Sequence, residues 1–378
     1  MKTDEHPRGD KTLQRSTNLL IILLISAGVL YFAKELFVPV FLGIFLSLML
    51  YPITAWLEKR HVPRVLAIFI TFLLVSSIIS GIIMFFSTHL IALFSDVNVF
   101  VAKLRAMKGE SETWLTLHTP LTRKKIDAML NQNTDLMGSA GSMFSSTVTS
   151  ASGLLTTIAI TMVYTFMFLV YRTSIRNFIL LYFEGADKIR ASHTLLEIQK
   201  VAQNYTFGLI LVTLTVGTLN TIGLYFIGID YPFLFGFFAA FLTIIPYIGT
   251  ITGSVLPAAY AFLTYESHWK PALVIMLFFT VQQLEGNFIS PKILGSRVSV
   301  NALFAFTALL VGGFFWGVPG MILSIPYTAM MKVVFCNIES LLKYGHLISD
   351  EFIDRDFGEF RVTQITQVNI LKRRKNIK

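Results

Sequence analysis

A carboxylate stands inside an apolar stretch of the chain, beside carboxamide side chains with which it could bind a proton or a cation. Glu285 falls in the stretch 271–289, between Gln282 and Asn287. A carboxylate at membrane depth is costly and usually lines a cavity or a proton path. Lys292 follows closely, so an ordinary ion pair at the membrane interface would also account for Glu285. Both interpretations stay open on the sequence.

Asp230 is a second candidate, in the motif GIDYP at the end of an apolar span. It could contribute to a transport path, or it could be a solvated carboxylate in a turn. Its position at the end of the span favours the turn carboxylate.

Two apolar stretches are too long to cross a bilayer once. As one helix, 300–331 would be about 48 Å long, against a hydrocarbon core of ~30 Å. We therefore expect it to fold back as a broken hairpin, and 232–265 to do the same. Glycines and prolines interrupt both stretches, and they lower the free-energy cost of reversing the chain. They are Gly312, Gly313, Gly317, Pro319, Gly320 and Pro326 in one stretch, and Pro246, Gly249, Gly253 and Pro257 in the other.

Each broken stretch also carries two glycines four residues apart, in GTITG (249–253) and GFFWG (313–317). This spacing places both glycines on one helix face and lets backbones approach closely. Ordinary helix packing explains either motif alone. Paired interruptions in a transporter point instead to a binding site, because unwound backbone offers free carbonyls and amides to a solute or ion.

The composition predicts a membrane protein, and the lack of catalytic motifs predicts that it is not an enzyme. Of 378 residues, 54% are hydrophobic and 14% charged, against ~25% charged in soluble domains. The net charge of +9 is spread over segment ends rather than gathered in a nucleic-acid surface. One cysteine, Cys336, excludes an intramolecular disulfide and any multi-cysteine metal site. No phosphate-binding loop, HExxH or GxSxG motif occurs, so we expect no catalytic residues, cofactor or metal.

The apolar segments predict an all-α, polytopic integral membrane protein with about eight to ten membrane segments, two of them broken helical hairpins. The expected parts are N-terminal transmembrane helices (1–94), a polar, extracytoplasmic segment (95–147), a transmembrane helix (148–171), a cytoplasmic amphipathic segment (172–205), a C-terminal transmembrane core with two hairpins (206–338) and a cytoplasmic basic tail (339–378). Basic residues in short loops place both termini in the cytoplasm, and a bacterial inner membrane is the default location.

Three runs of residues resemble one family of bacterial transporters. IIPYIGTITGSVLPA (244–258), GNFISPKILGSRVSV (286–300) and FFWGVPGMILSIPYTAMMKV (314–333) are similar to the autoinducer-2 exporter (AI-2E) family. The proline after that family's polar cluster corresponds to Pro291, followed by Lys292. Its WGxPG turn corresponds to Trp316, Gly317, Pro319 and Gly320. The chain lacks a further upstream tryptophan that relatives often carry, which affects the pocket lining but not the fold.

The resemblance implies a secondary, gradient-driven inner-membrane transporter that is a homo-oligomer in the lipid bilayer. We expect an exporter of a small polar solute such as a quorum-sensing autoinducer. The alternatives are a sodium/proton antiporter of the same family, or a non-transporting membrane scaffold. Proton or sodium is the expected coupling ion, and no nucleic acid is expected to bind. The residues predicted around the path are Gln282, Glu285, Asn287, Asp230, Pro246, Gly249, Gly253, Pro257, Pro291, Lys292, Gly313, Gly317, Pro319, Gly320 and Pro326.

Overall fold

The described part of the chain is helical, as predicted. The computed structural model describes residues 8–94, 136–244, 248–267, 269–295 and 300–349. Among them the only β pairing is an isolated antiparallel bridge between Val300 and Ser349. Most of the predicted polar segment, Pro246 and the end of the basic tail lie outside the described residues. The prediction of an all-α polytopic membrane protein is confirmed.

Within the described residues, six helices are long and apolar enough to cross a bilayer, and four shorter apolar helices accompany them. The six are Lys34–Lys59, Arg64–His89, Thr156–Leu181, Gly185–Ile227, Trp269–Ile293 and Val318–Asn337. The shorter four are Leu20–Phe32, Pro232–Leu242, Gly253–Phe262 and Ala302–Trp316. Two pairs of neighbours in this series form the two broken hairpins.

The chain divides into two compact units. Unit 1 is Met1–Arg172 with Thr213–Glu285, and unit 2 is Thr173–Val212 with Gly286–Lys378. Helices α6 (Leu136–Leu181) and α7 (Gly185–Ile227) each contribute to both units. The predicted boundaries at 171 and 205 therefore fall within continuous helices. Which of these parts lies in the membrane and which in the cytoplasm stays a prediction.

Unit 1 begins with three helices, α1 (Arg8–Phe32), α2 (Lys34–Lys59) and α3 (Arg64–Phe94). The turn between α2 and α3 includes His61 in a left-handed conformation, with φ of 66°. Leu50 of α2, Ile68 of α3 and Leu169 of α6 form a buried apolar cluster. This cluster joins the α2–α3 pair to α6.

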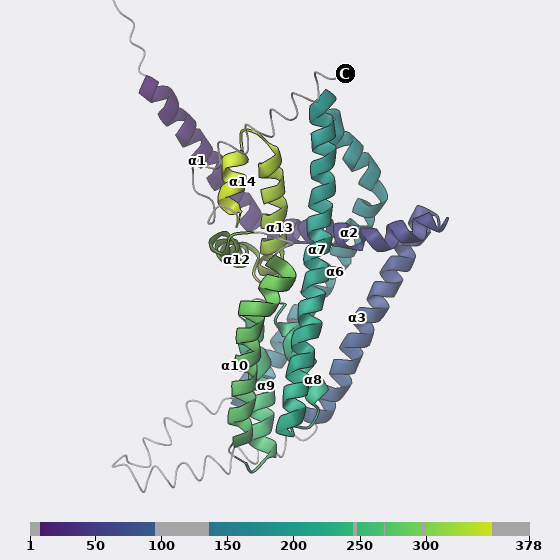
Figure 1. The fold of residues 1–378 in the computed structure, drawn as a ribbon, viewed down its shortest axis with the longest axis vertical. Coiled ribbons are helices and arrows are strands. Elements are labelled where there is room, and N and C mark those ends of the chain that lie inside the picture. The colour runs from purple at the N-terminus through teal and green to yellow at the C-terminus, as the bar shows by residue number, and fades with distance from the viewer. Residues whose placement is uncertain (1–7, 95–135, 245–247, 268, 296–299, 350–378) are drawn as a thin grey trace, which may run out of the picture. The chain divides into compact units, whose positions relative to one another are not determined.

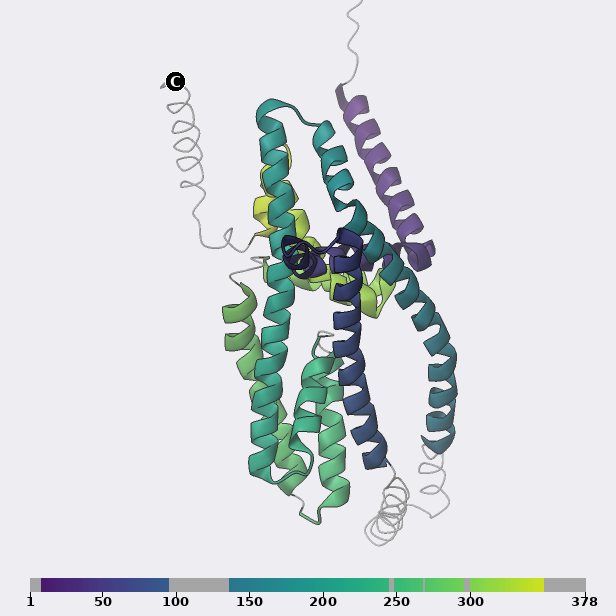
Figure 2. The ribbon, with the colours of Figure 1, turned by 90° about the vertical axis from the view of Figure 1, so that its right-hand side faces the viewer.

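Unit 1 also contains an antiparallel array of four helical segments. These are the C-terminal part of α7, α8 (Pro232–Leu242), α9 (Ile248–Thr264) and α10 (Trp269–Leu284), which lie side by side in Figures 1 and 2. Leu224, Phe235, Ala261, Val274 and Phe278 are among the members of one buried apolar cluster. Because each segment contributes to it, the cluster fixes their register.

The overlong stretch 232–265 breaks at one place, between α8 and α9. Helix α8 starts with a proline in its first turn, after Tyr231 in a left-handed conformation, and ends at Leu242. Helix α9 then starts at Ile248 and continues through Gly253 and Pro257. We call α8–α9 the first hairpin. Gly249, Gly253 and Pro257 therefore pack within α9 and do not interrupt it.

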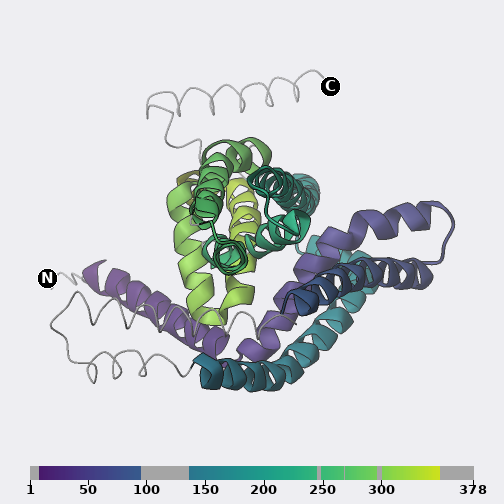
Figure 3. The same cartoon turned by 90° about the horizontal axis from the view of Figure 1, so that it is seen from below.

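Unit 2 contains the second hairpin, α12 (Ala302–Trp316) and α13 (Val318–Asn337), followed by α14 (Leu342–Ile348). Figure 3 shows α12 and α13 side by side. At the other end of α13, Asn337 Nδ2 donates to Glu197 Oε2 of α7 at 3.1 Å. The first residues of the predicted basic tail thus form a helix.

Candidate transport site

In the first hairpin, glycines of α9 pack directly against the backbone of α8. A Cβ atom on Gly249 would overlap the carbonyl group of Leu242, at the end of α8. One turn further on, a Cβ on Gly253 would lie 2.9 Å from the Cα of Ala239. Both glycines are buried, so the GTITG motif brings α9 against α8 as its spacing predicts. Its second predicted role, as part of a transport path, stays a prediction.

The second hairpin uses a different glycine pair from the one its spacing predicted. Gly317 is not on a helix face: it lies between α12 and α13 with φ of 64° and makes the turn. The close approach joins Gly312 to Gly320, where a Cβ on either would overlap the other's carbonyl oxygen. Gly313 instead faces the flexible side chain of Met321. GFFWG is therefore a turn motif, which corrects the expectation of one packing face.

The prolines of the two hairpins lie in packed surroundings. Pro257 and Pro326 are inside helices α9 and α13 and are buried. Pro319 follows the Gly317 turn at the start of α13, where its missing N–H costs nothing. The first hairpin belongs to unit 1 and the second to unit 2. That the two hairpins flank one path stays a prediction.

Glu285 stands where α10 changes its winding. The chain continues after α10 as π-helical turns, Glu285–Ile289 and Pro291–Gly295. Such turns are rare and often occur at functional sites. Glu285 is half-buried, as is Gln282, whereas Asn287 and Lys292 are exposed. Since Glu285 is seven residues after Phe278, it lies on the α10 face that packs into the apolar cluster.

Asp230 belongs to a polar clasp at the opposite end of α10. Its carboxylate accepts a hydrogen bond of 2.8 Å from the Tyr265 hydroxyl, and its N–H donates one of 2.8 Å to the same oxygen. Lys270 Nζ donates to Gly228 O at 2.8 Å and lies 3.5 Å from the centre of the Tyr265 ring. Helix α10 separates this clasp from Glu285 by about 24 Å. The structure therefore does not bring Asp230 and Glu285 together.

Replacing Tyr265 with phenylalanine is expected to destabilise this clasp by about 1 kcal/mol, since two exposed hydrogen bonds are lost. Burial raises the pKa of the Tyr265 hydroxyl to about 12 from an ordinary value of 10.0. Because the neutral form is favoured in the folded protein, the contribution is complete below about pH 10 and is lost as the pH rises through about 12. Thermal unfolding of Tyr265→Phe and of the exposed control Tyr225→Phe checks both points. A difference between them that disappears between pH 6 and 9 would contradict the assignment.

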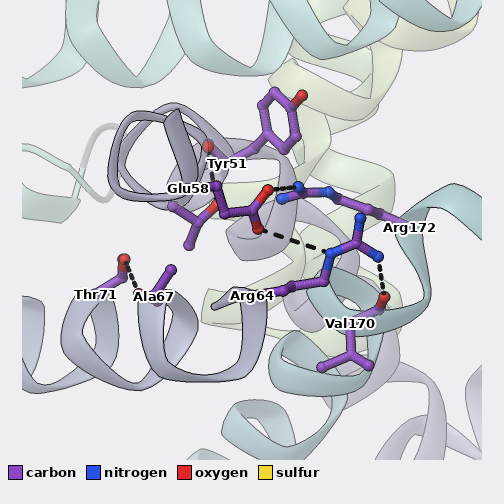
Figure 4. Close-up of polar contacts among 8 residues, drawn as sticks. Tyr51, Glu58, Arg64, Ala67, Thr71, Val170 and Arg172 are labelled. Carbon is purple, nitrogen blue, oxygen red and sulfur yellow. Dashed lines mark hydrogen bonds and ion pairs between the residues drawn. The ribbon is translucent and has the colours of Figure 1, made fainter. Parts of the chain in front are cut away.

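An ionic cluster near the α2–α3 turn was not predicted. Glu58 pairs with Arg172 of α6, and its other oxygen lies 3.8 Å from Arg64 Nε (Figure 4). Arg64 Nη1 also donates to the Val170 carbonyl at 3.1 Å, and the Arg172 guanidinium lies 4.7 Å from the centre of the Tyr51 ring. In the sequence, Arg64 and Arg172 were interpreted as topology signals at the ends of apolar segments. Nothing in the sequence indicated that both contact the carboxylate of Glu58.

Asn220 is the second residue that the sequence did not single out. It lies in α7 and is only 2% exposed. Its Oδ1 atom accepts no hydrogen bond from the residues that the structure describes. Buried polar atoms are normally satisfied, so such an atom calls for an explanation. The sequence feature that could have identified Asn220 is the presence of a single asparagine within the apolar part of α7.

The fold and these residues define a class of protein before any comparison. Six of the described helices are long and apolar enough to cross a bilayer, two overlong apolar stretches fold back as helical hairpins, and polar side chains lie inside apolar helices. These are features of membrane transporters. A model of the AI-2E family of transporters matches residues 20–340, and the chain belongs to that family.

Several curated relatives extend over most of the chain. YrrI of Bacillus subtilis, a candidate transport protein, is 29% identical over 319 residues, which are 80% of this chain and 87% of YrrI. YueF of the same organism, also a candidate transport protein, is 25% identical and covers 82% of this chain and 86% of its own length. TqsA of Escherichia coli, an AI-2 transport protein, is 24% identical over 87% of this chain and 94% of its own.

Proposed function

We propose that this membrane transporter is a secondary transporter of the bacterial inner membrane that exports a small polar solute, driven by an ion gradient. The first hairpin carries the proposal most directly. Its two helices, α8 and α9, are held together by buried glycines. Helix α10 packs into the same apolar cluster as these two helices, carries Gln282 and is followed directly by Glu285. Broken helices of this kind offer unpaired backbone groups to a solute or an ion.

An autoinducer is the proposed cargo because TqsA is an AI-2 transport protein. The proposal includes cytoplasmic N- and C-termini and a homo-oligomer in the bilayer. A proteoliposome flux screen tests it, with autoinducer-type furanoses, sodium and protons under imposed gradients. Gradient-dependent movement of a furanose is the expected result. Sodium and proton exchange without solute movement would favour the antiporter, and no flux of any kind would favour the scaffold.

Glu285 is the proposed coupling group. The Glu285→Gln variant keeps the size and hydrogen-bonding ability of the side chain but cannot release a proton near neutral pH. We expect its flux to lose its dependence on the proton gradient, with a fall of about tenfold under a full gradient. Glu184→Gln, at an exposed carboxylate in the α6–α7 turn, is the control and should transport normally. An unchanged gradient dependence in Glu285→Gln would remove its role.

A further inference from the structure

Asn220 stands out among the buried groups that the proposed function leaves without a role. At 2% exposure its carboxamide is out of reach of bulk water. Burying a polar group without a compensating hydrogen bond costs on the order of 1–3 kcal/mol in proteins. Leucine would fill the same place in an apolar helix without that cost. A polar group kept in such a position is commonly one that a ligand or water satisfies.

The register of the four-helix array places Asn220 level with the middle of α9. Leu224, one turn after Asn220 on the same face of α7, packs with Ala261 of α9 in the apolar cluster. Helices α7 and α9 run in the same direction because the chain reverses twice between them. One turn before Ala261 is Pro257. Asn220 and Pro257 therefore share a level, where Leu256 and Ala258 still pack against the apolar cluster.

Pro257 supplies a second oxygen acceptor at this level. Proline has no N–H, so the carbonyl of Gly253 loses the partner that a regular helix would give it. Helix carbonyls point toward the C-terminal end, so this oxygen is directed at the level of Pro257. Pro257 is fully buried, and a Cβ atom on Gly253 would lie 2.9 Å from the Cα of Ala239. The small residues leave the Gly253 carbonyl close to the neighbouring helices.

Helix α10 brings a second carboxamide to the same level. It runs opposite to α7 and α9, so the residue one turn after Phe278 is level with the residue one turn before Leu224. That residue is Gln282, which is half-buried. Three helices thus bring two carboxamides and a backbone carbonyl to one level. None of these three groups carries a formal charge.

We propose that Asn220, the Gly253 carbonyl and Gln282 form a binding site for an uncharged, hydroxyl-bearing solute. This inference rests on the proposed function and names its solute class. A carboxamide offers a donor and an acceptor, as a hydroxyl group does, so the two are complementary. A cation would interact only with the acceptor oxygens of the site. It would also lie beside the apolar side chains of Leu224 and Phe278. Glu285, one turn beyond Gln282, stays the separate coupling group.

Cysteine labelling tests the site without knowledge of the cargo. Cys336 is the chain's single cysteine, so Cys336→Ser provides a background without thiols. In that background, Asn220→Cys is treated in native membranes with uncharged hydroxyethyl methanethiosulfonate and with the cationic trimethylammonioethyl reagent. Leu224→Cys, at 0% exposure in the same helix, is the matched control. Asp230→Cys, at an exposed turn residue, is the positive control.

We expect Asn220→Cys to react with the hydroxyethyl reagent faster than with the cationic one, while Leu224→Cys stays unreactive. If Asn220→Cys is as inert as Leu224→Cys, Asn220 is a structural amide and the site does not exist. If only the cationic reagent reacts, the solute class is wrong. Neither outcome depends on flux, so the proposed function is judged separately by the wild-type flux screen.

Transport kinetics give a second, independent readout. For the solute that the screen identifies, Asn220→Leu should raise KM by about tenfold with little change in kcat, since a hydrogen bond to the solute is lost. Asn204→Leu, at an exposed position of α7, should leave both parameters unchanged. Wild-type flux with an unchanged KM in Asn220→Leu would overturn the inference while leaving the proposed function intact.

Discussion

Replacing Gly249 with leucine is expected to abolish transport, with a loss of about 3 kcal/mol or more in the free energy of unfolding. The Cβ atom alone would overlap the carbonyl group of Leu242 and the amide of Thr243. These are backbone atoms and cannot rotate away, so α9 would have to leave α8. The first hairpin would then open at its break. Thermal unfolding in detergent and flux in proteoliposomes measure the two effects.

Gly81 provides the matched control for this substitution. It lies in α3, and a Cβ atom there would meet nothing within 4 Å. Gly81→Leu should therefore insert, unfold and transport like the wild type. Gly249→Ala, with a smaller side chain but the same first clash, should behave much like Gly249→Leu. Normal stability and flux in Gly249→Ala would show that the close packing of this hairpin is unnecessary.

Removing the carboxylate of Glu58 is expected to have the second-largest effect, a loss of about 2 kcal/mol in stability. In Glu58→Gln, Arg172 would keep its charge in a mostly buried place, with a side chain 19% exposed, and lose its anionic partner. Arg64 would lose its weaker contact with the same carboxylate. The link of α2 and α3 to α6 should loosen. The thermal unfolding midpoint in detergent reports the change.

An exposed ion pair in the same chain is the control. Glu339 lies 3.5 Å from Arg190, but its side chain is 89% exposed. Glu339→Gln should cost no more than about 0.5 kcal/mol because water screens the pair. The double variant Glu58→Gln with Arg172→Gln should regain part of the stability, since no unpaired buried charge is left. Equal effects of Glu58→Gln and Glu339→Gln would mean that burial adds nothing to the first pair.

The hairpins show what segment length and glycine spacing predicted correctly and what they did not. Excess length predicted that 232–265 and 300–331 fold back, and both do. The same reasoning assigned the close approach in the second hairpin to Gly313 and Gly317, whereas Gly312 and Gly320 make it. Spacing of four residues describes one continuous helix. Here the turn at Gly317 ended the helix, so the contact formed between residues on opposite sides of the turn.

The polar residues show the opposite limit. Glu285 and Asp230 drew notice because carboxylates are rare inside apolar sequence, yet the structure places them at opposite ends of α10. The sequence did not indicate that Glu58 and Arg172 form a pair, because 114 positions separate them in the chain. Asn220 was unremarked because its burial depends on how α7 packs in the four-helix array.

The sequence by itself determined that this chain is an all-α membrane protein with two broken hairpins, and that it resembles the AI-2E family. Length, hydropathy and the positions of glycine and proline are local properties, and the bilayer converts them directly into helices and breaks. Only the tertiary structure decided which glycines touch backbone, which charges pair and which amide is buried. Those depend on helix register and packing, which bring together residues that no local pattern connects.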